Sequence, residues 1–245
     1  MRVTPVLVIS AFPMAQNVIF PLALMYPTRL LSSHFYTEEV QVKAHHDETS
    51  KRQGYFRPIL RFLTTMAPSN EHKQSLSSLL NDSKIPNPIT ILSLLPLFSK
   101  GTDLKDCTSS NKWSVSFFSG GAFDVMKLSA PHVKLLMSTH KIRGSILWFP
   151  RFRLQQYANL VHQIDMAIAR EGGPKVLNFV DLKKACHLRG LNVQNQNESV
   201  MQEYLQQWLS VTLKLDALSM SLLLHLPILL GYNHASRIWD KRSIQ

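Results

Sequence analysis

Apolar residues recur at helical spacing along most of the chain, most clearly between Asn178 and Leu209. Two stripes spaced three or four residues apart predict two short helices joined by a polar loop. The first stripe contains Leu182, Ala185 and Cys186, and the second contains Met201, Tyr204, Leu205, Trp208 and Leu209. We therefore predict a helical hairpin over residues 178–209.

Both predicted hairpin helices are bounded by residues that commonly end helices. Asn178 is expected to cap the first helix, and Asp181, three residues later, to help satisfy the free N–H groups of its first turn. Gly190 stands where a helix end favours a left-handed residue. Asn197 or Ser199 is expected to cap the second helix.

Five other apolar stretches predict helices or short helical elements before the hairpin. Four of them cover residues 37–67 as one or two helices, a Leu-rich helix ending near Leu80, residues 89–98 with an interruption at Pro96, and residues 125–140. The clearest amphipathic helix is residues 152–170, whose expected buried stripe is Tyr157, Leu160, Val161, Ile164 and Ile168. Between the stretches at 89–98 and 125–140, residues 99–121 are rich in Ser, Gly, Lys, Asp and Asn, which predicts a flexible loop.

The last apolar run, residues 217–232, is short for a membrane span and contains His225 and Pro227. A spanning helix needs about 20 mostly apolar residues. We therefore predict a buried core helix here.

The first apolar run, residues 3–28, contains no charged residue and lies between Arg2 and Arg29. It is long enough for a spanning helix, and its internal prolines are tolerated where neighbouring groups satisfy the freed carbonyls. The long apolar run and the weakly charged start argue against a secretory signal peptide. We predict a transmembrane segment within residues 1–28 and an all-α domain over residues 29–245.

The net charge of +11 and the pI near 9.8 add a preference for polyanions. Such a balance suits a phosphate-rich partner or an anionic membrane surface, although a solvated basic surface without a ligand would give the same composition. The hydrophobic fraction of 45% is ordinary and allows a sizeable core.

Basic residues in the carboxy-terminal half form the candidate binding set. They are Lys134, Lys141, Arg143, Arg151, Arg153, Lys183, Lys184 and Arg189. On the hairpin, Lys183, Lys184 and Arg189 lie off the apolar stripe and are expected to face water. A rigid helical surface bearing these charges would hold rRNA phosphates without reading bases, and the binding would weaken steeply with salt.

No motif in the sequence indicates catalysis, a cofactor or a metal. Cys107 and Cys186 have no CxxC partner, and Cys186 is expected in the core. Gly-rich phosphate loops, GxSxG and HExxH are absent from the sequence. His45, His46 and Asp47 have no third ligand at a fixed spacing, so a solvated face is expected there. We predict a protein that is not an enzyme.

The ordered set of segments resembles the LETM family. LKKACHLRGL at 182–191, followed by LQQWL at 205–209, resembles the SAP-like hairpin that ends the LETM-type ribosome-binding domain. The flanking segments LVHQIDMAIA at 160–169 and SMSLLLHLPILL at 219–230 are similar to the family's neighbouring helices. Residues 9–27 and 25–35 resemble the membrane span and the segment after it. The similarity is closest to the family's short members, which lack an EF-hand and a coiled-coil tail.

This resemblance implies a single-pass protein of the mitochondrial inner membrane whose matrix-side helical domain binds the mitochondrial ribosome. Residues 3–28 would contact the bilayer, and rRNA or ribosomal proteins would be the partner. The family normally has an Arg-rich targeting segment upstream, which this sequence does not show, so we expect a truncated form of the gene product.

Two alternatives remain open. Long family members have a glutamate inside the span, and Gln16, which cannot titrate, occupies that position here. A role as a subunit or regulator of mitochondrial cation–proton exchange is therefore weakened. SAP-like hairpins also occur in DNA-binding proteins, so a DNA-binding module is the other alternative.

Overall fold

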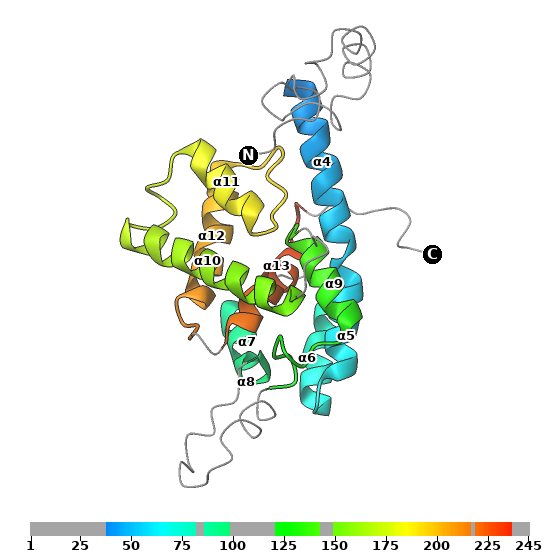
Figure 1. The fold of residues 1–245 in the computed structure, drawn as a ribbon. Helices are drawn as coiled ribbons and strands as arrows, with labels where there is room; N and C mark the ends of the chain where they lie inside the picture. The colour runs from blue at the N-terminus through cyan, green and yellow to red at the C-terminus, as the bar shows by residue number, and fades with distance from the viewer. Residues whose placement is uncertain (1–37, 82–85, 99–120, 143–148, 217–218, 237–245) are drawn as a thin grey trace, which may run out of the picture. The chain divides into compact units, whose positions relative to one another are not determined.

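The computed structural model describes residues 38–81, 86–98, 121–142, 149–216 and 219–236, and the elements in these ranges are all α-helical. The helices are α4 (Glu38–Gly54), α5 (Phe56–Met66), α6 (Asn70–Asn81), α7 (Pro88–Ser93), α8 (Leu95–Phe98), α9 (Ala130–Thr139), α10 (Pro150–Arg170), α11 (Phe179–Leu188), α12 (Glu198–Thr212) and α13 (Met220–Gly231) (Figure 1). The all-α fold predicted from the sequence is confirmed for the described residues.

The chain divides into two compact units, Met1–Thr49 and Ser50–Gln245. The described part of the first unit is the amino-terminal portion of α4, where His45, His46 and Asp47 are exposed, as predicted. The second unit contains the last turn of α4 and all later helices.

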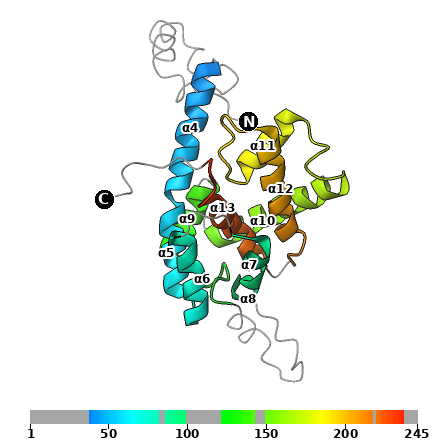
Figure 2. The same ribbon diagram turned by 180° about the vertical axis from the view of Figure 1, so that it is seen from behind.

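Helix α13 forms the centre of the second unit. Every residue from Met220 to Gly231 is buried, including His225 and Pro227. The helix packs against α5, α8, α10 and α12, and Figures 1 and 2 show it surrounded by these helices. A helix that is apolar on all sides must be enclosed, which confirms the prediction of a buried core helix.

Proline positions set several helix boundaries. Helix α7 begins at Pro88 after the Asn87 side chain, which accepts a hydrogen bond from the Ile89 N–H at 3.3 Å. Helix α9 begins at Ala130, so the prediction of a helix from Val125 is wrong at its start. Pro131 is accommodated in the first turn of a helix but not in its interior, and the helix therefore starts just before it.

The buried face of α10 differs from the predicted stripe. Val161 and Ile168 are buried and Tyr157 and Ile164 are partly buried, but Leu160 is 55% exposed. The buried positions are Leu154, Ala158, Val161, Asp165 and Ile168. The prediction for Leu160 is wrong because the buried face of α10 includes Asp165. A search for apolar residues at helical spacing does not count a carboxylate as buried, so it placed the face incorrectly.

No helix within the described ranges is both long and apolar enough to cross a membrane. The predicted membrane segment 1–28 with Gln16, residues 99–120 of the predicted loop, Cys107 and Arg143 all lie outside the described residues.

Candidate functional site

The hairpin contains both predicted helices, α11 and α12, which pack against each other. The Asn178 side chain accepts a hydrogen bond from the Asp181 N–H at 2.8 Å, which confirms the predicted cap. Gly190 has a φ of +97° at the end of α11, as predicted for a left-handed residue. Asn197 occupies the cap position of α12, but its side chain makes no capping hydrogen bond, so the second predicted cap is confirmed in position only.

The facing stripes of α11 and α12 fill the space between the two helices. Leu182 and Cys186 are buried, as are all five predicted residues of α12. The Cys186 thiol donates to the Met201 carbonyl at 3.3 Å, and burial raises the thiol's pKa to about 12. Cys186 is therefore a protonated core residue, as expected.

Arg189 lies inside the protein, not on its surface. Its guanidinium is 1% exposed and forms an ion pair with Asp165 of α10, with 3.0 Å between Arg189 Nε and Asp165 Oδ1. The other Asp165 oxygen accepts from Trp208 Nε1 at 2.8 Å. The prediction that Arg189 faces water is wrong, because Asp165 supplies a buried carboxylate that its guanidinium can bind.

The backbone of the hairpin's turn is tied to the same cluster. Arg189 Nη1 donates to the Ala185 carbonyl at 2.7 Å, and Tyr204 Oη donates to the Arg189 carbonyl at 2.9 Å. These bonds link α10, α11 and α12 through polar groups that are buried and paired, which is the condition under which buried charge is tolerated.

A second buried arginine, Arg52, holds the end of α11. It comes from the last turn of α4, within the second unit, and is 4% exposed. Its two terminal nitrogens donate to the His187 carbonyl at 2.6 Å and the Leu188 carbonyl at 2.8 Å. A positive charge at a helix carboxyl end is stabilised by the helix dipole and satisfies terminal carbonyls.

Sequence reasoning missed both arginine clusters. The available signal was Asp165, which lies four residues after Val161 and three before Ile168 on the buried face of α10. A carboxylate at such a position needs a buried cationic partner. Nothing in the local pattern around Arg52 indicates its distant acceptors.

Of the predicted basic residues, Lys134, Lys141 and Lys184 are exposed and Lys183 is half-buried. Lys183 lies 5.1 Å from the centre of the Phe179 ring, and Lys184 pairs with Asp181 at 3.1 Å. Arg151 and Arg153 are half-buried on α10, and Arg151 donates to the Leu128 carbonyl at 2.8 Å. Their role in binding stays a prediction.

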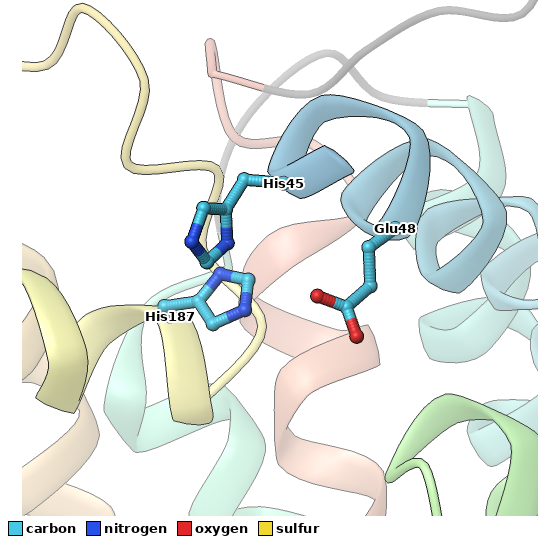
Figure 3. Close-up of side chains that lie close together, drawn as sticks. All are labelled: His45, Glu48 and His187. Carbon is cyan, nitrogen blue, oxygen red and sulfur yellow. The ribbon is translucent and has the colours of Figure 1, made fainter. Parts of the chain in front are cut away.

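The structure brings one of the predicted lysines, Lys141, close to the hairpin. Lys141, directly after α9, has a φ of +55°, and its Nζ lies 3.2 Å from His187 Nε2 at the end of α11. Figure 3 shows the His187 side chain on α11 and the His45 and Glu48 side chains on α4. Lys141 and α11 therefore contribute to one surface.

Three buried histidines lie on α13 or form hydrogen bonds with it. His225 Nδ1 lies 2.8 Å from the Ser221 carbonyl and must donate to it, so His225 Nε2 accepts from His132 Nε2 at 3.0 Å. His140 Nε2 donates to the Leu224 carbonyl at 2.8 Å. Burial lowers the pKa of His132 to about 4 and that of His140 to about 3, so both are neutral at physiological pH.

Comparison with known proteins gives matches over almost the whole chain. LETM1 domain-containing protein 1 of Homo sapiens is 29% identical over 237 residues, covering 93% of this chain and 59% of that protein. The Bos taurus protein of the same name is 27% identical, covering 93% and 59%, and that of Xenopus tropicalis is 26% identical, covering 97% and 64%. The chain spans about three fifths of the length of these relatives. No solved structure matches it.

The family model described as LETM1-like, RBD matches residues 1–229, and these include the hairpin, α10 and nearly all of α13. This match covers most of the chain, and the same family was indicated by the order of segments in the sequence. The chain belongs to the LETM1-like ribosome-binding domain family.

Proposed function

We propose that this protein binds the mitochondrial ribosome through its helical domain, and that residues 3–28 anchor it in the mitochondrial inner membrane with this domain in the matrix. Its role would be to hold the ribosome near the bilayer, which requires binding and no catalysis. The observation that supports the proposal most is the match of the ribosome-binding domain model to residues 1–229.

The surface chemistry is suited to this role. Lys134, Lys141 and Lys184 are exposed on or next to helices, and Lys183 is half-buried beside them on α11. Lysines placed in this way bind phosphate oxygens as point charges and give affinity without base recognition. Because each phosphate contact releases counterions, binding of this kind falls steeply with rising salt.

The buried arginines contribute in another way. The Arg189–Asp165 pair holds the hairpin on α10, and the bonds from Arg52 hold the end of α11 against the last turn of α4. A fixed hairpin presents Lys183 and Lys184 in one arrangement, so less conformational entropy is lost when they bind.

Co-sedimentation of the full chain with purified mitochondrial ribosomes, at low and high salt, tests the proposal. We expect binding at low salt that weakens strongly as salt is raised. Absence of binding at low salt would overturn the proposal.

Competition between duplex DNA and the ribosome for this protein separates ribosome binding from general DNA binding. An excess of duplex DNA should leave most of the chain on the ribosome if the ribosomal surface is the specific partner. Complete displacement by DNA at an equal concentration of phosphate would favour a general nucleic-acid module.

A further inference from the structure

The start of α11 presents a cluster of apolar side chains to solvent. Val176 is 66% exposed, Phe179 45% and Val180 58%, all within five residues. Scattered apolar residues on a surface need no partner, whereas a cluster ringed by polar residues marks an interaction site. We refer to residues 175–184 as the α11 tip; Figure 1 shows this helix following the loop after α10.

The chain leading into the α11 tip and its first turn are held in a defined conformation. Helix α10 is followed by Gly172 and Gly173, with φ values of +108° and +84°, and the Gly173 N–H donates to the Ile168 carbonyl at 2.9 Å. Asn178 accepts from the Asp181 N–H and donates through Nδ2 to Asp181 Oδ2, both at 2.8 Å. The exposed side chains are therefore oriented before any partner arrives.

The core does not use these exposed side chains. Leu177, just before the cap, packs against the core, and Leu182, in the first turn of α11, is fully buried. A hydrophobic pair at these two positions commonly fixes the entry of the chain into a helix. Val176, Phe179 and Val180 are exposed and remain available to an external surface.

Lysines flank the apolar cluster on both sides. Lys175 precedes it and is exposed, while Lys183 and Lys184 follow it, with Lys183 near the Phe179 ring. Apolar residues beside lysines are the composition of segments that insert into the interface of anionic bilayers. The uncharged run at 3–28 also predicts attachment of this chain to a bilayer.

Other occupants fit the α11 tip less well. A second copy in a symmetric contact would bring the lysines of both copies together, and three apolar side chains offer far less than the roughly 800 Å² per partner of a stable interface. Nucleic acid would match the lysines and could stack on Phe179, but it gains nothing from two exposed valines.

We propose that the α11 tip docks onto an anionic lipid surface. Val176, Phe179 and Val180 enter the headgroup region, and Lys175, Lys183 and Lys184 contact lipid phosphates. This inference goes beyond ribosome binding and does not depend on it.

Amide hydrogen exchange on the full chain in lipid nanodiscs tests the proposal without any ribosome. One disc contains an equal mixture of phosphatidylglycerol and phosphatidylcholine, and the other contains phosphatidylcholine alone. We expect slower exchange across residues 175–184 in the anionic disc. Equal exchange in the two discs would overturn the proposal, as would protection that appears only after ribosomes are added.

Variants of the α11 tip separate the contribution of the lysines to this protection from that of the apolar side chains. Replacing Lys175, Lys183 and Lys184 with glutamine should reduce protection by about fivefold per lysine, and the triple variant V176S/F179S/V180S should abolish it. The control is Ile89→Ser on α7, a single exposed apolar residue that should leave protection unchanged. Circular dichroism confirms folding of each variant. Protection that survives in folded variants would contradict lipid docking.

Discussion

The inner and outer faces of the hairpin use positive charge in opposite ways. On the inner face, Arg189 is buried against Asp165 and Trp208, while on the outer face Lys184 and the half-buried Lys183 lie at the surface. Arginine suits the interior because its planar fork makes several directed hydrogen bonds, and lysine suits the surface because its charge stays hydrated. A count of basic residues therefore overestimates the charge available to a partner.

Removing the buried partner of Arg189 on the inner face should lower the stability of the fold more than any other change considered. Replacing Asp165 with asparagine would leave the Arg189 charge buried without its counterion. We expect a loss of about 3–5 kcal/mol in the free energy of unfolding, measured by urea denaturation.

The matched control for Asp165 lies on the outer face. Asp181→Asn removes a carboxylate that pairs with exposed Lys184, and a surface pair contributes about 0–1 kcal/mol. Losses of equal size in the two variants would contradict the difference between the faces.

Acidification should cause the next largest loss of stability, because the folded protein keeps buried histidines neutral while the unfolded chain protonates them. Burial lowers the pKa of His132 to about 4 and, with a smaller contribution from Arg52, that of His140 to about 3. The unfolded chain takes up these protons near pH 6.5 and the folded chain does not, so stability is full above pH 6.5 and falls below it. Each histidine should cost about 1.4 kcal/mol per pH unit down to its folded pKa.

Thermal melts between pH 7.5 and pH 5 measure this dependence. A melting temperature that is constant over this range would show that the histidines are not buried in the neutral form.

A smaller loss of stability is expected on replacing Gly190, which follows the end of α11. Its φ is +97°, and an added Cβ would lie 2.9 Å from Pro227 Cβ. Gly190→Ala should therefore lower stability by about 1–2 kcal/mol for the backbone conformation alone. Gly54→Ala, where a Cβ meets open space, should be neutral or stabilising, and calorimetry compares the two variants.

The sequence predicted the helices and caps of the hairpin well because their signals are local. Asn178, Gly190 and the apolar stripe of α12 are recognisable within a few residues of chain. The predicted start of α9 was wrong because the helical spacing of apolar residues continues before Pro131. The helix itself cannot continue there, because proline is accommodated only in the first turn.

The candidate site was predicted only in part because charge burial depends on distant residues. Lys134 and Lys184 are exposed as expected, but whether Arg189 faces water depends on Asp165, 24 residues earlier in the chain. The bonds from Arg52 to the end of α11 span 135 residues or more. Periodicity on one helix holds no information about such partners.

We expect the surface lysines, and not the buried arginines, to bind the ribosome. The most direct measurement is the slope of log affinity against log salt for the full chain on mitochondrial ribosomes, compared with the variant K134Q/K141Q/K183Q/K184Q. The variant should fold normally, and its slope should be reduced by roughly 1 for each lysine that contacts a phosphate. A slope identical to that of the unmodified chain would contradict this expectation.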